Sequence, residues 1–309
     1  MGLEGALRDL GLKAAEMRFG EPLGRHTSLG IGGRAEVYAR PGTARDLARI
    51  LAFDWQMPVY FLGGGTNILI MDEDIKALFI STGGLKGIEV KKLSRDEFLP
   101  ILSVRAGESL KGVLAFCMKN GLSGLEPLTG IPGSVGGAVA GNAGAHGLEI
   151  GDVIRLVRVM GEKGGIKEMS GEEMGFFYRG SALLAKGTVS PDGLIIGAEL
   201  ALKPGSPMEI RALMARNFNI KKKTQPLQAR SAGCVFKNPE GRAAGSLIEE
   251  AGFKGARVGG VEVSVVHANF FINRGDGSAE DFLRLMDKVS DGVEKRFGIR
   301  LEPEIRILD

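Results

Sequence analysis

Residues 122–147 read LSGLEPLTGIPGSVGGAVAGNAGAHG, and this stretch indicates how the chain folds. Its glycines lack a Cβ, so the main chain can approach a bulky group closely and adopt positive φ angles without a steric penalty. Ordering so many glycines costs conformational entropy, so the ordered segment needs something to hold it. A flexible linker is the alternative, but linkers lack apolar residues such as Leu125, Ile131, Val135 and Val139. We expect a folded cradle whose bare main chain faces a ligand.

Apart from its glycine content, the composition is that of an ordinary globular protein. The 309 residues include 48 glycines without a collagen-like period, and the length favours two or three lobes over one core. A formal net charge of +3 and an aromatic content of 6% argue against nucleic-acid binding. Cys117 and Cys234 are the only cysteines, and no apolar leader or long apolar run is visible. We expect a cytoplasmic protein without disulfides or a membrane partner.

Apolar periodicity predicts a mixture of strands and helices. Strands are expected at residues 35–39, 58–62, 68–70, 101–106, 153–160, 194–202 and 301–308, with a strand pair or one long strand at 258–273. Helices are expected at residues 2–20, 43–51, 110–117, 208–218, 246–251 and 278–297. Cys117 falls on the apolar stripe of its helix and is predicted to be core, whereas Glu304 is expected within the last strand.

The segment GGGTN at residues 63–67 joins two of these strands. Because an apolar strand follows it, it is not the glycine turn that opens a helix in dinucleotide-binding folds. Its successive amides could form a concave nest for phosphate oxygens, with Thr66 and Asn67 adding side-chain hydrogen bonds. A plain hairpin turn explains the residues equally well.

Arg179 lies in GFFYRGS, residues 175–181, beside three aromatic side chains. A half-buried arginine there needs a carboxylate or an anionic substrate, because an unpaired buried charge is costly. A surface arginine next to an apolar anchor is the alternative. No cluster of metal-type ligands has suitable spacing, so no metal site is predicted.

Five motifs follow one another along the chain: GGGTN at 63–67, IPGSVGGAVAGNAGAHG at 131–147, YRGS at 178–181, SAGCVFKNP at 231–239 and LEPEIRIL at 301–308. In this order and at these separations they resemble the UDP-N-acetylenolpyruvoylglucosamine reductases of bacterial cell-wall synthesis. The resemblance covers nearly the whole chain. It implies a flavoenzyme that binds FAD, oxidises NADPH and reduces UDP-N-acetylglucosamine enolpyruvate to UDP-N-acetylmuramate.

The fold that this resemblance implies is α+β, with a two-part FAD-binding domain of the vanillyl-alcohol-oxidase (PCMH) type and a C-terminal α+β substrate-binding domain. The break at Pro204–Pro207 separates the two. The predicted boundaries are an N-terminal helical segment at 1–20, the FAD-binding domain at 21–205 (subdomains about 21–90 and 91–205), the substrate-binding domain at 206–300 and a C-terminal strand at 301–309.

The resemblance also assigns site residues, which we carry over position by position. Those expected to bind the cofactor are Gly63, Gly64, Gly65, Thr66, Asn67, Gly130, Pro132, Gly133, Ser134, Gly136, Gly137, Asn142, Ala143 and Gly144. Those expected to bind the substrate are Tyr178, Lys222 and Asn238. The catalytic residues are expected to be Arg179, Cys234 and Glu304.

Arg179 and Glu304 match residues that polarise the substrate carboxylate, and Cys234 matches the proton donor. The commonest family pattern has serine at the position of Cys234, but a thiol, with an ordinary pKa of about 8.5, is a competent acid. A small buried cysteine is the alternative. The tyrosine loop of one subgroup has no counterpart here, so the chain resembles the shorter subgroup.

Other functions remain open from the sequence. A related flavin oxidase would often hold its flavin covalently, and His146 is the candidate residue at the cradle. An inactive sugar-nucleotide-binding protein is the other alternative, although Arg179, Cys234 and Glu304 are all present. We expect the partners to be the sugar nucleotide and NADPH alone, with the protein a monomer.

Overall fold

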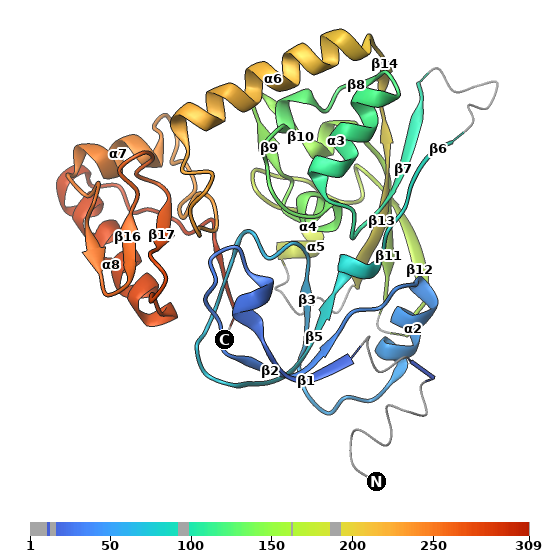
Figure 1. Cartoon of the computed structure of the whole chain (residues 1–309), viewed down its shortest axis with the longest axis horizontal. Coiled ribbons are helices and arrows are strands. Elements are labelled where there is room, and N and C mark those ends of the chain that lie inside the picture. The colour runs from blue at the N-terminus through green and yellow to red at the C-terminus, as the bar shows by residue number, and fades with distance from the viewer. Residues whose placement is uncertain (1–10, 13–16, 92–98, 162, 186–192, 309) are drawn as a thin grey trace. The chain divides into compact units, whose positions relative to one another are not determined.

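The structure is a computed structural model that describes residues 11–12, 17–91, 99–161, 163–185 and 193–308. Its helices and strands confirm the predicted α+β class (Figure 1). Contacts divide the chain into two compact units. The first unit contains Met1–Gly20, Glu36–Gly64 and Lys76–Phe218, and the second contains Glu21–Ala35, Gly65–Ile75 and Asn219–Asp309.

The first unit is built on a five-stranded antiparallel sheet with the order β12-β11-β13-β7-β6. The strands are β6 (Ile88–Lys91), β7 (Ile101–Arg105), β11 (Ile154–Met160), β12 (Ile166–Ser170) and β13 (Leu194–Ala201). Residues 194–200 of the central strand β13 are all buried, as expected for a strand covered on both faces. Helices α3 (Leu110–Lys119) and α4 (Val135–Ala140) lie against one face of this sheet (Figure 1).

Helix α3 begins and packs as its sequence predicts. The Ser109 side chain accepts a hydrogen bond from the Gly112 N–H at 3.0 Å and so caps the helix. Leu110, Val113, Leu114 and Cys117 face the core, which confirms the prediction for Cys117. Burial, with a smaller contribution from the Glu126 charge, raises the pKa of the Cys117 thiol to about 12.

A four-stranded sheet has the order β1-β2-β5-β3, and most of its residues belong to the first unit. Its strands are β1 (Met17–Pro22), β2 (Arg34–Ala39), β3 (Val59–Leu62) and β5 (Ile75–Ser81). Helix α2 (Ala44–Ala52) follows β2 within the predicted range, is capped by Thr43 and buries Leu47 and Ile50. The predicted helix at residues 2–20 falls mostly outside the described residues, and its last four residues begin β1.

The remaining elements of the first unit are short. They are β8 (Leu122–Ser123) paired with β14 (Lys203–Pro204), β9 (Gly144–Ala145) paired with β10 (Leu148–Glu149), and α5 (Ala182–Ala185). The Gly205 N–H also donates to the Gly121 C=O at 2.8 Å, so the Pro204–Pro207 break is tied to the first unit. The boundary between the compact units falls later, within helix α6 (Pro207–Thr224) after Phe218. The domain boundaries predicted from the sequence stay a prediction.

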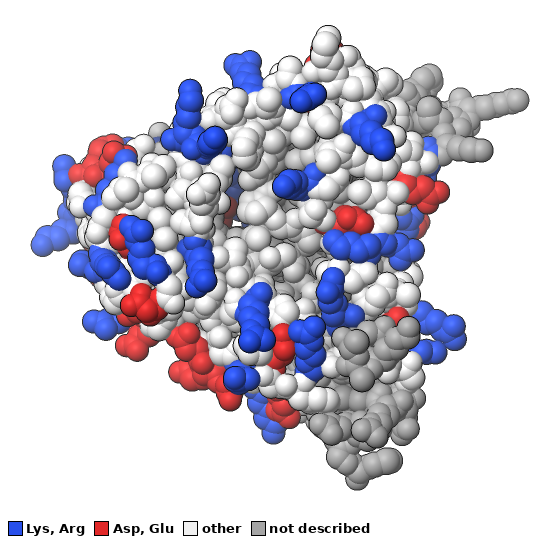
Figure 2. All heavy atoms as spheres, in the orientation of Figure 1, with Lys and Arg blue, Asp and Glu red and all other residues white. Residues whose placement is uncertain are grey.

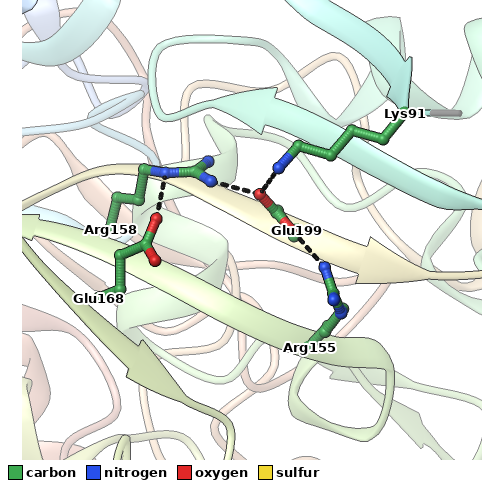
Figure 3. Close-up of polar contacts among 5 residues, drawn as sticks. All are labelled: Lys91, Arg155, Arg158, Glu168 and Glu199. Atoms are coloured by element: carbon green, nitrogen blue, oxygen red, sulfur yellow. Dashed lines mark hydrogen bonds and ion pairs between the residues drawn. The ribbon is translucent and has the colours of Figure 1, made fainter. Parts of the chain in front are cut away.

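Glu199 on β13 is a buried carboxylate surrounded by cations from neighbouring strands (Figure 3). It accepts hydrogen bonds from Lys91 and Arg158, and from the Arg155 Nη1 at 2.9 Å. Arg158 also donates to Glu168 at 2.9 Å. Burial alone would raise the pKa of Glu199, but the hydrogen bonds and charges of Lys91 and Arg158 hold it below the ordinary value. This cluster ties β6, β11 and β13 together through their side chains.

The second unit is built mainly from two small sheets and two helices in its described part, besides the end of α6. Its elements are an antiparallel sheet of β15 (Arg257–Val258), β16 (Val261–Val263) and β17 (Phe271–Asn273), a parallel pair of β4 (Ile68–Ile70) and β18 (Arg306–Leu308), and the helices α7 (Ala244–Glu250) and α8 (Ala279–Phe297). Helix α8 begins with a capping box, in which Ser278 and Asp281 each accept the other's main-chain N–H. Phe236, Phe271 and Phe282 pack together in the core.

The C-terminal strand is shorter than predicted, and Glu304 lies outside it. Only residues 306–308 pair with β4. Pro303 has no N–H to donate, and the N–H groups of Glu304 and Ile305 both turn to the Val235 C=O, at 2.7 and 3.3 Å. The prediction that Glu304 sits within a strand is therefore wrong.

Candidate active site

Two glycine segments of the predicted cofactor site interlock within the first unit. A Cβ added at Gly64 would lie 2.6 Å from the Gly133 Cα, and one added at Gly63 would lie 2.8 Å from the Ser134 Oγ. Real Cβ atoms do not make such contacts, so glycine at position 64 allows its main chain to meet that of Gly133, and glycine at position 63 leaves room for the Ser134 hydroxyl. Gly64 and Gly137 remain exposed, which leaves bare main chain at the surface. This arrangement fits a large planar cofactor with a pyrophosphate, since peptide amides suit such a group.

The predicted hairpin alternative for GGGTN is wrong, because β3 pairs with β5 and β4 pairs with β18. The segment instead passes from the first compact unit to the second after Gly64. Gly65 has a φ of +63°, and a Cβ there would collide with the His26 C=O. The Asn67 side-chain amide donates to the Glu304 C=O at 3.1 Å, and the Asn67 C=O accepts the Arg306 N–H at 3.1 Å. Asn67 is thus bound directly to the segment that carries Glu304.

The cradle contains a short helix, α4, whose first amides already have protein partners. Ser134 caps it by accepting the Gly137 N–H at 3.3 Å, and the Gly136 N–H donates to the Ala106 C=O at 2.8 Å. A Cβ at Gly136 would lie 2.9 Å from the Ala106 Cβ, so this glycine allows close packing. Four other predicted cofactor-binding residues of the stretch are half-buried or exposed: Gly130, Pro132, Ala143 and Gly144.

Asn142 is buried and has a positive φ of 44°, which is uncommon for a residue with a side chain. Its Nδ2 donates to Glu149 at 2.5 Å and to the Phe177 C=O at 3.1 Å, and its Oδ1 accepts the Gly151 N–H at 3.1 Å. The side chain therefore joins the cradle to the turn that carries Arg179.

Arg179 lies in a tight turn in which Phe177 and Gly180 exchange two main-chain hydrogen bonds of 3.0 Å. Its φ of +59° is left-handed, a strained conformation that is concentrated at functional sites. The guanidinium lies 4.7 Å from the centre of the Tyr178 ring, and its Nη1 is 3.8 Å from the Glu149 Oε1. The side chain is 24% exposed, so of the two alternatives that the sequence left open the structure shows the half-buried arginine.

Gly144 explains how close Arg179 comes to the cradle. A Cβ at Gly144 would lie 3.2 Å from the Arg179 Nη1 and 2.9 Å from the Glu149 Cγ. The structure thus brings Gly144, Tyr178 and Arg179 together within the first unit. Glu149 was not among the residues predicted from the sequence, where its one signal was an acidic residue shortly after the glycine-rich stretch.

Cys234 and Glu304, far apart in sequence, come together in the second unit. Cys234 is half-buried and forms a β-bridge with Phe270. The next residue, Val235, accepts the main-chain N–H of Glu304 at 2.7 Å. Unlike Cys117, Cys234 is therefore not a core cysteine. The two catalytic residues predicted in this unit lie on adjacent hydrogen-bonded segments.

The predicted substrate residues of the second unit occupy different settings. The Asn238 Oδ1 accepts the Ala244 N–H at 3.0 Å and so satisfies the start of α7. Lys222 is exposed in the last turn of α6, whereas its neighbour Lys221 is 7% exposed.

His146, the candidate for covalent flavin attachment, lies in the first unit, in the turn between β9 and β10. His146 and Gly147 are both exposed, and both have positive φ angles, as in a type I′ hairpin.

Within the described ranges, no group of three or more His, Cys, Asp or Glu side chains could hold a metal ion. Within the same ranges, no helix has the length and hydropathy needed to cross a bilayer.

Known proteins resemble this chain over nearly its full length. Residues 225–308 match the family described as UDP-N-acetylenolpyruvoylglucosamine reductase, C-terminal domain, and residues 35–170 match an FAD binding domain family. The chain is 39% identical over 307 residues to UDP-N-acetylenolpyruvoylglucosamine reductase 2 of Symbiobacterium thermophilum, covering 99% of this chain and 95% of the relative. It is 37% identical over 299 residues to the reductase of Caldanaerobacter subterraneus, covering 96% of this chain and 95% of the relative.

A solved structure gives the same picture. The crystal structure of UDP-N-acetylenolpyruvylglucosamine reductase from Thermus caldophilus superposes with a TM-score of 0.79 at 35% sequence identity. The match covers 95% of this chain and 98% of that chain.

Proposed function

The chain belongs to the UDP-N-acetylenolpyruvoylglucosamine reductase family, and we infer from this that it reduces UDP-N-acetylglucosamine enolpyruvate to UDP-N-acetylmuramate. The protein is an FAD-dependent oxidoreductase that takes electrons from NADPH and acts in peptidoglycan precursor synthesis. The observation that carries this conclusion is the similarity to named reductases over almost the entire length of the chain.

Bound FAD supplies hydride transfer to the substrate. We propose that the cofactor-binding residues predicted from the sequence hold it, mainly through their main chain. The interlocked pairs Gly63–Ser134 and Gly64–Gly133 support this role, because side chains at these glycines would force the two glycine segments of the cradle apart. The Asn142 side chain already binds Glu149, Phe177 and Gly151, so its proposed role is to hold the cradle in shape through these hydrogen bonds.

Arg179 is proposed to bind the substrate carboxylate and to stabilise the negative charge that develops there when hydride adds to the vinyl carbon. Its guanidinium is preorganised by the Tyr178 ring and by Glu149, so little rearrangement is needed when the anion arrives. The left-handed main chain at Arg179 is consistent with a conformation selected for function, because it costs stability.

Cys234 is proposed to donate the proton that completes the reduction at the carbon next to the carboxylate. A thiol is a far stronger acid than an alcohol, so cysteine can fill this role where serine is commoner. Glu304, on the adjacent segment, is proposed to act in its protonated form as a hydrogen-bond donor to the substrate carboxylate.

The proposed substrate contacts are Tyr178, Lys222 and Asn238. Lys222 is exposed in the last turn of a helix, where an ammonium group can attract the phosphates of a sugar nucleotide. We further propose that the protein is a cytoplasmic monomer that does not bind nucleic acid. On the face drawn in Figure 2, basic side chains are scattered among acidic ones, and the formal net charge is only +3.

A two-step anaerobic titration tests the function. NADPH should bleach the flavin absorbance of the purified protein, and the enolpyruvyl sugar nucleotide should then restore it with formation of UDP-N-acetylmuramate. A reduced flavin that the sugar nucleotide leaves unchanged would overturn the assignment. Flavin that stays with acid-precipitated protein would instead favour a covalent flavin oxidase.

A further inference from the structure

Asn269 is a buried residue whose side chain pairs with the main chain of Phe236 in the second unit. Its side chain accepts the Phe236 N–H at the Oδ1, at 2.9 Å, and donates from the Nδ2 to the Phe236 C=O at 2.7 Å. The residue is 1% exposed. A side-chain amide carries one acceptor and one donor group, so asparagine can take the place of a neighbouring peptide in a strand ladder.

The same residue also holds the peptide next to Cys234. The Asn269 C=O accepts the Val235 N–H at 2.8 Å, while the Val235 C=O accepts the Glu304 N–H at 2.7 Å. Three hydrogen bonds from Asn269 therefore fix residues 235 and 236, and these residues in turn fix Glu304. The distance between the main chains of Cys234 and Glu304 depends on this clamp.

Asn269 is itself held in place from its own loop. Its N–H donates to the His267 Nδ1 at 3.3 Å, and the Ser264 Oγ accepts the N–H groups of Val266 and His267 at 3.1 and 3.3 Å. Hydrogen bonds within the loop leading to β17 therefore hold its main chain in place up to Asn269. A substitution there would leave a buried N–H and C=O of Phe236 without partners, and the segment would have to shift to satisfy them.

We propose that Asn269 is a positioning residue for the protonation step, acting through Cys234 and Glu304 without touching the substrate. This role rests on the proposed function, since Cys234 and Glu304 take their catalytic roles from it. Hydride transfer from NADPH to the cofactor needs neither residue. Loss of Asn269 should therefore affect only the second half of the catalytic cycle.

The test uses Asn269→Ser, whose side chain is too short to reach both Phe236 groups, with the near-isosteric Asn269→Asp as a second variant. Stopped-flow absorbance gives the rate of flavin reduction by NADPH and, separately, the rate of reoxidation by the enolpyruvyl sugar nucleotide. We expect an unchanged reduction rate and a reoxidation rate lower by about 10²-fold, the loss that a misplacement of about 1 Å can cause.

Asn273→Ser is the matched control. Asn273 is also buried, at 4% exposure, and its side chain also makes three main-chain hydrogen bonds, to Leu29, Gly275 and Gly277. None of these bonds involves residues 234–236. The control should lose comparable thermal stability while its reoxidation rate stays near that of the wild type.

A double-mutant cycle with Cys234→Ala separates positioning from general damage. If Asn269 acts through Cys234, the two substitutions should be far from additive, and Asn269→Ser should slow reoxidation little further once the thiol is gone. Unchanged reoxidation in Asn269→Ser, or equal slowing in Asn273→Ser, would overturn the role of Asn269, and additive effects in the cycle would overturn the part of that role that acts through Cys234. Normal reoxidation in Cys234→Ala alone would instead refute Cys234 as the proposed proton donor. Because Asn269 is unchanged in that variant, this outcome can be distinguished from a failure of the role proposed for Asn269.

Discussion

The main-chain N–H of Glu304 donates a 2.7 Å hydrogen bond to the C=O of Val235, the residue that follows Cys234. This bond joins two parts of the chain that are about seventy residues apart in sequence. It places a carboxyl group and a thiol on neighbouring segments of one compact unit. Such proximity is what a proton donor and a carboxylate-binding acid for the same substrate require.

Cys234→Ala should leave reduction of the flavin by NADPH intact and slow its reoxidation by the enolpyruvyl substrate by about 10²–10⁴-fold, because the proton donor is lost. Cys234→Ser should recover much of the rate. Cys117→Ala is the control, since that buried thiol, with its pKa raised to about 12, should affect stability only. Rapid-mixing absorbance measures both steps, and unaltered turnover in Cys234→Ala would remove the thiol from the mechanism.

Arg179→Gly should separate stability from activity. Glycine tolerates a φ of +59°, so about 1 kcal/mol of strain is relieved, which offsets the lost contacts with Tyr178 and Glu149. Activity should fall by about 10²–10³-fold, because the charge on the substrate carboxylate loses its cation.

Gln56→Gly is the matched control for Arg179→Gly. Gln56 is exposed and also has a positive φ, of 48°, but it is not among the predicted site residues. This variant should gain stability without losing activity. Thermal denaturation measures the stability of both variants, and steady-state kinetics measure their activity. Full activity in Arg179→Gly would contradict the role proposed for Arg179.

Lys222→Ala should raise the KM for the sugar nucleotide, with a larger effect at low salt than at high salt, because added ions screen the attraction between an exposed ammonium group and phosphate. Lys223→Ala changes the next position, about 100° further round the helix. It should change KM little at any ionic strength. Equal losses for Lys222→Ala at all salt concentrations would indicate packing instead of charge.

Glu199→Gln should lower the free energy of unfolding by about 1–3 kcal/mol at neutral pH, because three cations lose their shared anion. The figure is below that for a fully buried pair, since the cations are 27–45% exposed. Glu168→Gln, at a carboxylate that is 55% exposed, should cost about 0–1 kcal/mol.

The stabilisation by Glu199 should also depend on pH. Its pKa is lowered in the folded protein, so the contribution is complete above the unfolded-state pKa of about 4.3 and is lost as the pH falls through the lower folded-state value. Urea unfolding of wild type and Glu199→Gln should therefore converge in acid. A difference between them that grows on acidification would contradict the described role of the cluster.

Sequence patterns predicted the elements that depend on local periodicity. The helices α3 and α8 and the strand β13 lie where the spacing of apolar residues predicted them, because these elements depend on neighbouring residues. The strand at Glu304 was predicted too long, because strand pairing is set by a distant partner, and β4 reaches only residues 306–308.

The surroundings of the site were harder to predict for the same reason. Asn142 reaches Phe177, thirty-five residues away, and Asn269 reaches Phe236, thirty-three residues away. Nothing in a local pattern distinguishes these asparagines from turn residues. The motifs identified candidate reacting groups, whereas the residues that hold them became visible only when the chain was folded.

The parallel pairing of β4 with β18 has a consequence for biosynthesis. Residues 68–70 are synthesised well before residues 306–308, so β4 must wait for its partner during translation. The second unit therefore cannot complete its fold until residue 308 has left the ribosome, and a product that terminates before residue 306 would leave β4 unpaired.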